Sequence, residues 1–335
     1  MAAFTAFTIS LLFFPVLIRK LRQAKIGENI RKEESAQFYN LHQAKQGTPT
    51  MGGILILAAI LISTFLWADI TNRYILISNF VLIWLGITGF FDDYIKQIRQ
   101  KSKGLTVRAK LISQIILGLL IGVFLFLDPQ FSTKLDIPFL KQIQINLGIF
   151  YVLLITLVIC GSSNAVNLTD GLDGLAIGNV IMVALSFSVL SYVSGHAKFS
   201  QYLFIPYLEG SGELTIFCAS IVGSGLGFLW FNCYPASIFM GDVGSLPLGG
   251  ALGTVAVLIK KELLLVIVGG IFVVEAISVI LQIASFRIRE KRIFKIAPLH
   301  HHFQFTGWQE SKVIVRFWII AALLALFTLI TLKIR

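Results

Sequence analysis

Several short motifs in the sequence place carboxylate, amide and histidine side chains next to glycine. The pair Asp92-Asp93 is followed by Lys96, four residues after Asp92, which is the favourable order for an ion pair on one helix. A helix C-terminus carries partial negative charge, so two adjacent acids there require a compensating cation. That cation is either Lys96 or a bound divalent ion, and a solvated helix end with a structural salt bridge is the alternative.

The segment NAVNLTDGLDG gathers four carboxylate or amide side chains within ten residues. They are Asn164, Asn167, Asp170 and Asp173. Because its glycines weaken a helix, we expect a broken or re-entrant hairpin that lines a polar cleft. The alternating oxygen ligands and the closing Glu of an EF-hand are missing. A helix-capping loop is the structural alternative.

Asp242 lies between Gly241 and Gly244, where we predict the start of a helix. Asp is a good helix N-cap, which is a sufficient structural explanation of this residue alone. The flanking glycines also allow a ligand to approach the backbone closely. An acid beside the NH groups of a helix start can hold a hard cation, and those NH groups can hold phosphate.

Two further motifs are less specific. Neighbouring residues on a helix diverge by about 100°, so at most two of His300, His301 and His302 face one site. In their basic loop they suit pyrophosphate contact or proton handling, although such a loop also attracts anionic lipid. The segment KQGTPTMGG, from Lys45 to Gly53, lacks the ending of a P-loop and alone predicts only a turn.

The elements that position these motifs are apolar helices. Of the 335 residues, 56% are hydrophobic and 13% are charged, which excludes an ordinary water-soluble enzyme. Three cysteines without metal-ligand spacing support neither a disulfide framework nor a zinc site. Ten segments are long enough to cross a bilayer: 2–18, 51–67, 74–91, 111–127, 145–163, 175–193, 214–230, 243–259, 263–286 and 313–332. We therefore predict one all-α integral membrane domain over residues 1–335, and we expect its first span to be retained.

The distribution of Lys and Arg predicts the orientation of these spans. With the N-terminus outside, 19 of the 28 Lys and Arg fall in inner loops and 8 on the outer side. Both termini are then outside, and the predicted cytoplasmic loops are about 19–50, 92–110, 164–174, 231–243 and 287–312. The carboxylate and histidine motifs all fall at the inner ends of spans. The sequence therefore predicts an active site on the cytoplasmic face.

Glu275 is the ionisable residue inside the ninth predicted span. Such a residue is costly in a bilayer and indicates function or an interhelical hydrogen bond. We favour the hydrogen bond. An ion-coupled transporter with Glu275 in its pathway is the remote alternative.

Taken in order, five motifs resemble one family closely. GTPTMGG, DDYIK, NAVNLTDGLDGLA, MGDVGSLPLGG and PLHHHF are similar to the motifs of the polyprenyl-phosphate N-acetylhexosamine-1-phosphate transferases. The uninterrupted histidine run resembles the muramoyl branch of that family. Two departures are visible: Gln304 stands where the branch commonly has Glu, which concerns the sugar pocket, and Pro247 falls in a stretch that is more often Ser-Leu-Ala-Leu.

The resemblance implies an Mg²⁺-dependent enzyme in which undecaprenyl phosphate attacks UDP-N-acetylmuramoyl-pentapeptide, giving lipid I and UMP in peptidoglycan synthesis. It implies Asp242 as the metal ligand, Asp92 as the base, and Asp93 as support for one or the other, so that Asp92 and Asp93 are further metal candidates. His301 completes the catalytic set. The substrate-binding candidates are Lys45, Thr50, Lys96, Lys110, Asn164, Asn167, Asp170, Asp173, Asn232, Phe239, His300 and His302.

Direct attack is favoured over an aspartyl-phosphate intermediate. The partners implied are the two substrates and membrane lipid, with no nucleic acid, in the bacterial inner membrane. The resemblance also suggests a homodimer, for which the sequence shows no interface. A sister transferase that uses UDP-N-acetylglucosamine is the alternative within the same enzyme class.

Overall fold

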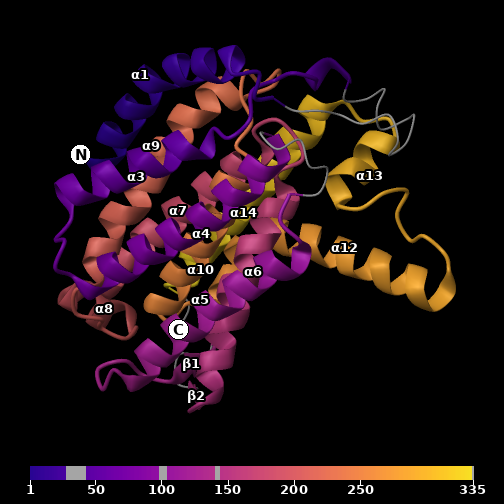
Figure 1. Ribbon diagram of the computed structural model, residues 1–335. Helices are drawn as coiled ribbons and strands as arrows, with labels where there is room; N and C mark the ends of the chain where they lie inside the picture. The colour runs from indigo at the N-terminus through magenta and orange to yellow at the C-terminus, as the bar shows by residue number, and fades with distance from the viewer. Residues whose placement is uncertain (28–42, 98–103, 140–143, 334–335) are drawn as a thin grey trace.

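The computed structural model describes residues 1–27, 43–97, 104–139 and 144–333, and these residues form a helical bundle (Figure 1). Its apolar helices are α1 (Ala2–Gln23), α3 (Gly53–Trp67), α4 (Arg73–Gln97), α5 (Val107–Leu127), α6 (Phe150–Thr169), α7 (Leu175–Ser194), α9 (Leu214–Asn232), α10 (Asp242–Leu258), α12 (Gly270–Arg289) and α14 (Glu310–Ile330). Shorter elements connect them: η1 (Gln43–Lys45), α8 (Ala197–Leu203), η2 (Ser211–Glu213), α11 (Glu262–Val268) and α13 (Leu299–Phe305).

Each of the ten predicted segments overlaps an apolar helix among the described residues, and the count of ten membrane spans stays a prediction. Within the described residues, eight helices are long and apolar enough to cross a membrane. The other two, α3 and α10, are shorter apolar helices of 15 and 17 residues. The predicted class, an all-helical multi-pass membrane protein, is confirmed.

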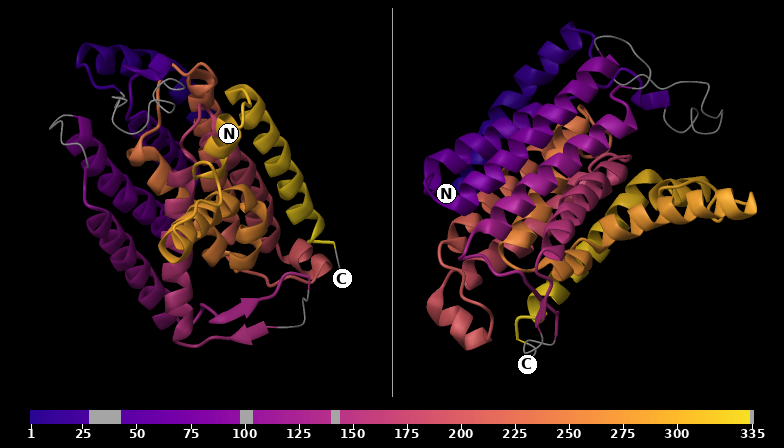
Figure 2. Two further views of the ribbon diagram at one scale, coloured as in Figure 1. Left: turned by 90° about the vertical axis from the view of Figure 1, so that its right-hand side faces the viewer. Right: turned by 60° about the horizontal axis from the view of Figure 1, so that its bottom comes forward.

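Two features of the fold depart from the prediction. Strands β1 (Lys134–Asp136) and β2 (Gln144–Asn146) pair in an antiparallel hairpin in the connection between α5 and α6. The ninth predicted segment is broken at Gly269-Gly270 into α11 and α12, and α12 diverges from the bundle (Figure 2). Two adjacent glycines weaken a helix at this point because they lose the most backbone freedom when they become ordered.

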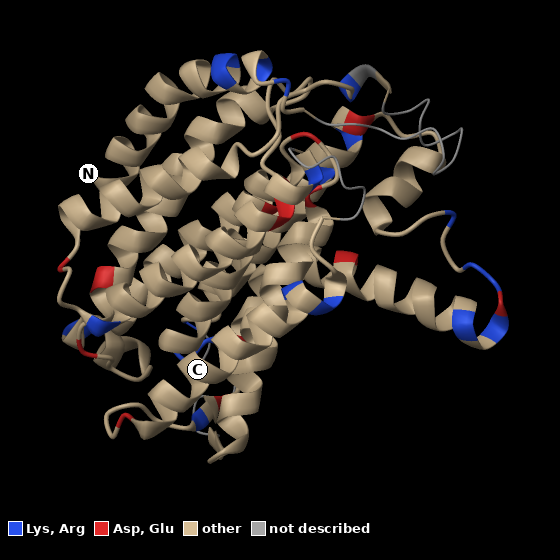
Figure 3. Cartoon of the chain, viewed as in Figure 1, with Lys and Arg blue, Asp and Glu red and all other residues tan. Residues whose placement is uncertain are grey.

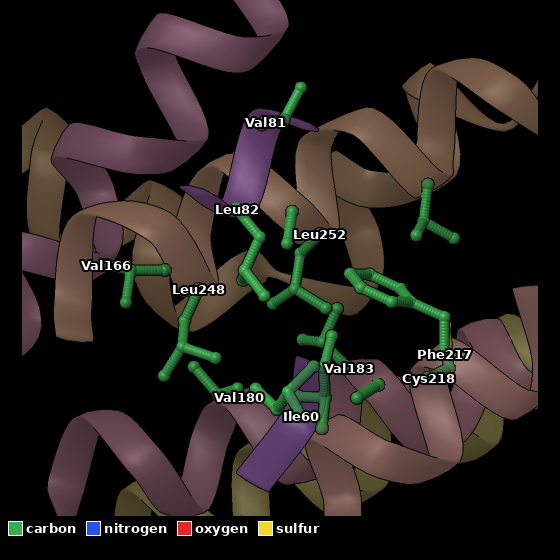
Figure 4. Packing of buried hydrophobic residues seen from close by; sticks show 14 of the residues in the cluster. Ile60, Val81, Leu82, Val166, Val180, Val183, Phe217, Cys218, Leu248 and Leu252 are labelled. Carbon is green, nitrogen blue, oxygen red and sulfur yellow. The ribbon is translucent and has the colours of Figure 1, made fainter. Parts of the chain in front are cut away.

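Helix α10 forms the centre of the bundle. Every residue from Val243 to Leu258 is buried. In Figure 4, Leu248 and Leu252 of α10 meet apolar side chains from α4, α6, α7 and α9. Small residues allow this close packing: a methyl group at Gly249 would lie 2.4 Å from the carbonyl oxygen of Ser162 in α6.

The bundle has two polar ends separated by an apolar middle. Most of its charged residues lie toward those ends and at the tip of α12 (Figure 3). Helices α4 and α6 end where α10 begins, since Asp92 and Asn167 both lie close to Asp242. Helix α14 begins at the same end, where Glu310 reaches Asp173. The motifs of the sequence are thus gathered at one end.

Candidate active site

Three aspartates converge where α4 meets the start of α10. One carboxylate oxygen from each of Asp92, Asp93 and Asp242 lies within 4.8 Å of the others, a set that could hold a metal ion. Gly89 makes the approach possible, because a β-carbon there would lie 2.2 Å from the carbonyl oxygen of Asp242. Asp92 and Asp93 are buried, and Asp242 is half-buried. We call these three residues the aspartate cluster.

One of the two adjacent aspartates, Asp93, caps the start of α10. The Oδ2 atom of Asp93 accepts the backbone N–H of Val243 at 2.9 Å, which satisfies one of the amides exposed at the start of α10. Asp242 is the first residue of this helix, and the preceding N-cap position is Gly241, which has no capping side chain. The structural alternative, in which Asp242 is the N-cap of this helix, is therefore wrong. Asp93 provides the cap from α4, so the Asp242 carboxylate is available for other partners.

Two lysines and an amide surround the other two carboxylates. Lys96 forms an ion pair with Asp92, as the i, i+4 spacing predicts, and its Nζ lies 3.4 Å from Asp242. Lys110, in α5, lies 2.8 Å from Asp242 and 3.5 Å from Asp92. Asn167 donates to Asp242 at 2.9 Å and to the Ser245 hydroxyl at 2.8 Å. Asp242 is thus held between α4, α5 and α6.

The aspartate cluster has more negative than positive charge. Three carboxylates face the ammonium groups of Lys96 and Lys110, whose side chains remain 35% and 21% exposed. Hard divalent cations prefer carboxylate oxygens, and one carboxylate in excess favours such an ion. The donor set therefore fits a hard divalent cation by its chemistry.

A second polar group lies between η1, the α6–α7 turn and the start of α14. Asp173 accepts a hydrogen bond from the ammonium group of Lys45 at 2.7 Å and another from the N–H of Ala236 at 2.9 Å. Glu310 forms an ion pair with the same Lys45, and its Oε1 accepts the backbone N–H of Asp173 at 3.1 Å. We call Lys45, Asp173 and Glu310 the lysine cluster.

The histidines lie on α13, which begins beside Glu275 of α12. The Glu275 carboxylate accepts the N–H of His300 at 3.1 Å, and the Nδ1 of His300 is 3.1 Å from it. His300 and His301 have ring centroids 4.1 Å apart, whereas Nδ1 of His302 accepts the N–H of Lys295 at 3.1 Å. The prediction that at most two histidines face one site is confirmed, and Glu275 makes the hydrogen bond between elements that we favoured.

Comparison with known proteins identifies the family of this chain. The profile of glycosyl transferase family 4 matches residues 73–260, and signature 1 of phospho-N-acetylmuramoyl-pentapeptide-transferase matches residues 45–57. Phospho-N-acetylmuramoyl-pentapeptide-transferase of Desulforapulum autotrophicum is 52% identical over 332 residues, which cover 99% of this chain and 91% of that protein. The protein of the same name from Geobacter sp. (strain M21) is 52% identical over 334 residues, covering 100% of this chain and 92% of its own length. The chain belongs to the phospho-N-acetylmuramoyl-pentapeptide-transferase family. The predicted family and its transferase class are confirmed.

Some residues predicted from the family motifs have mainly structural contacts. The amide of Asn164 donates to Gln114 at 2.6 Å and to the carbonyl of Cys160, away from the aspartate cluster. Asn232 accepts the N–H of Gly174 at 2.9 Å and donates to the carbonyl of Ile238 at 2.7 Å. Asn232 thus ties the loop before α10 to the α6–α7 turn.

The backbone at Phe239 and Thr50 joins two motifs of the family. The N–H of Phe239 donates to the carbonyl of Pro49 at 2.7 Å, and its own carbonyl accepts the N–H of Gly52 at 2.9 Å. Thr50, between these partners, is buried, and the Phe239 side chain is half-buried. This pairing places the start of α3 beside the start of α10.

The segment from Asn164 to Gly174 is not the hairpin we predicted. Helix α6 continues through Asn164 and Asn167 to Thr169, and α7 begins at Leu175. Only a five-residue turn separates the two helices, and Asp170 and Asp173 lie in it. The glycines fall after the end of α6 and not within it, so they do not break it.

Sequence reasoning missed Glu310 as a member of the site. An acid in the first turn of a helix is ordinary, because it interacts favourably with the helix dipole. Glu310 also lies 265 residues from Lys45, and no local spacing relates the two residues. The sequence carried no signal for this contact.

Proposed function

We propose that the aspartate end of the bundle transfers phospho-N-acetylmuramoyl-pentapeptide from UDP-N-acetylmuramoyl-pentapeptide to undecaprenyl phosphate, forming lipid I and releasing UMP. Similarity to the transferases over the whole chain supports this reaction, and the convergence of Asp92, Asp93 and Asp242 supports its location. A polar end with an apolar bundle behind it suits one lipid and one water-soluble substrate.

Asp242 would hold Mg²⁺, with Asp92 or Asp93 as a further ligand. When bound, the ion supplies charge neutralisation at the pyrophosphate and at the departing UMP. Asn167 orients the Asp242 carboxylate through the 2.9 Å hydrogen bond. The oxygen-rich donor set supports the choice of a hard cation over a softer metal.

Asp92 is the better candidate for the base that takes the proton from the lipid phosphate. Asp93 uses one oxygen to cap α10. The partners of Asp92 are instead Lys96, Lys110 and the N–H of Leu105, the last at 2.8 Å. Direct attack of the lipid phosphate needs no covalent bond to any of these carboxylates.

Lys96 and Lys110 would bind phosphate oxygens, which are anionic partners like the carboxylates they contact now. Lys45, Asp173 and Asp170, with Phe239 as a stacking face, would line the nucleotide side of the site. His300 and His301, beside the same α6–α7 turn, would contact phosphate or transfer a proton.

We also propose that the aspartate end faces the cytosol in the bacterial inner membrane, with both termini outside. The excess of Lys and Arg in the predicted inner loops supports this orientation. It agrees with a cytosolic nucleotide substrate. A homodimer stays a prediction, which mass measurement of the purified protein in detergent would test.

The test is UMP release by the purified protein from UDP-N-acetylmuramoyl-pentapeptide with undecaprenyl phosphate as acceptor. UDP-N-acetylglucosamine is offered in parallel, and turnover of that nucleotide alone would contradict the proposal. Asp242→Asn should remove UMP release, whereas Asp69→Asn, an exposed acid remote from the cluster, is the matched control. If the chain were instead a transporter, flux across sealed vesicles would survive Asp242→Asn.

A further inference from the structure

The ammonium group of Lys45 is placed by two carboxylates from distant parts of the chain. Asp173 lies 2.7 Å from Nζ in the α6–α7 turn, and Glu310 contacts Nζ from the start of α14. The side chains of Asp173 and Glu310 are 2% and 9% exposed, so both acids are enclosed. Glu310 also accepts the N–H of Asp173, and it therefore fixes the Lys45 ammonium and the turn together.

The second oxygen of Glu310 continues this chain of contacts. Its Oε2 accepts from the amide nitrogen of Gln304 at 3.5 Å, and the Oε1 of Gln304 lies 2.9 Å from the Nδ1 of His301. A carboxylate can only accept hydrogen bonds, so the NH₂ group of Gln304 must face Glu310. The amide oxygen then faces the imidazole, and Nδ1 of His301 must carry the proton.

The other ring nitrogen of His301 is directed toward the α6–α7 turn. A β-carbon at Gly171 would lie 3.1 Å from Nε2 of His301 and 2.4 Å from Nε2 of His300. Glycine is therefore required where the two rings approach the backbone of the turn. With the proton on Nδ1, the Nε2 atom that His301 presents there is an acceptor.

We propose that Glu310 and Gln304 are positioning residues that join Lys45 to His301. Glu310 holds the Lys45 ammonium against Asp173. Gln304 sets the tautomer of His301 so that its Nε2, which faces the α6–α7 turn, is the proton acceptor. We call this chain of contacts, from Lys45 through Glu310 and Gln304 to His301, the relay. It rests on the proposed function, in which Lys45 and His301 are site residues. It predicts that position 304 needs an acceptor toward Nδ1, a requirement that Glu would also meet.

Steady-state kinetics test the Lys45 part of the relay. Glu310→Gln should raise KM for UDP-N-acetylmuramoyl-pentapeptide about 10-fold, the loss expected for one charge-assisted hydrogen bond, with KM for undecaprenyl phosphate unchanged. Glu209→Gln, an exposed acid before η2, is the matched control and should behave as wild type. Equal changes in both KM values, or none, would overturn this role of Glu310.

Substitutions at position 304 test the His301 part. Gln304→Met keeps the volume but removes the acceptor, and it should lower kcat about 10-fold. Gln304→Glu keeps an acceptor toward His301, and its carboxyl group meets Glu310 by carrying the proton that the amide NH₂ donates now, so it should retain kcat within about twofold. Gln201→Met in α8, an exposed position, is the matched control. The relay is refuted if Gln304→Met keeps the wild-type kcat, or if Gln304→Glu is as slow as Gln304→Met.

The tautomer gives a readout that does not need turnover. In protein with ¹⁵N-labelled histidine, the His301 signals are assigned by their loss in His301→Gln. In wild type and in Gln304→Glu, these signals should report a protonated Nδ1 and an unprotonated Nε2. In Gln304→Met they should report a mixture of the two tautomers. A wild-type protein with protonated Nε2 contradicts the relay even if lipid I is made. Absence of UMP release with the expected tautomer would instead contradict the proposed function.

Discussion

Helices α4, α6 and α10 carry polar groups at both of their ends, and the two ends treat buried charge differently. At one end is the aspartate cluster. Near the other, Lys260 and Glu262 follow α10, with side chains 5% and 1% exposed. The Lys260 ammonium donates to the Tyr151 hydroxyl at 2.6 Å and to the carbonyl of Ser132 at 2.7 Å, and Tyr151 donates to Glu262.

The two ends differ in the balance of their positive and negative charges and in their exposure to solvent. Lys260 balances Glu262 one to one, and the rings of Phe131 and Tyr151 lie 4.8 and 3.8 Å from its Nζ. The aspartate cluster instead has three acids against two lysines at a partly exposed rim. Burial of charge alone therefore does not mark an active site. The proposed active site differs from the Lys260 end by an excess of negative charge at a partly exposed surface.

The largest expected effect is loss of all activity on metal removal. Excess EDTA should reduce UMP release to background, and added Mg²⁺ should restore it, because the carboxylate in excess needs a cation to bind an anionic pyrophosphate. Thermal unfolding of the chelated protein should stay cooperative. Full turnover in EDTA would show that the lysines alone neutralise the substrate.

Asp242→Asn should lower kcat about 1000-fold, in the range seen when a transition-state contact is removed. The variant keeps the size of the side chain and a hydrogen-bond acceptor for Asn167, so its unfolding temperature should stay close to wild type. A rate within about tenfold of wild type would mean that Asp242 is not the principal metal ligand.

At the opposite end, Lys260→Met should affect stability and not chemistry. It leaves Glu262 buried without its cation, which costs about 3–5 kcal/mol of unfolding free energy. The turnover of the folded fraction should remain within about twofold of wild type, measured by UMP release after correction for folded protein. A lower kcat would show that the two ends are coupled through α10.

The smallest expected effect separates the members of the aspartate pair. Asp93→Ala removes the cap of α10 and should cost about 1 kcal/mol of unfolding free energy, whereas Asp93→Asn keeps an acceptor for the N–H of Val243. Asp92→Asn should lower the unfolding free energy less than Asp93→Ala does, since it keeps an acceptor for the N–H of Leu105 and Asp92 caps no helix. Denaturant titration of the three variants checks this ranking, and an equal loss in Asp92→Asn would contradict it.

Much of this arrangement was predictable because a bilayer imposes long apolar runs. Those runs located the ten helices, and their alternating direction placed Asp92, Asp173 and Asp242 at one end. The length of α6 was not predictable from local rules. A glycine weakens a helix only when it lies inside the helix, and the sequence does not show that α6 ends before Gly171. The contact of Glu310 with Lys45 depends on how the last helix packs, which no local pattern encodes.

The complete enclosure of α10 keeps the helix that carries Asp242 out of contact with the membrane lipid. A helix of 17 residues is about 25 Å long, shorter than a hydrocarbon layer of about 30 Å. Because α10 touches protein along its whole length, it has no lipid-facing surface whose mismatch would tilt it. Thinning or thickening of the bilayer therefore acts first on the helices with exposed apolar side chains, and it reaches Asp242 only through them.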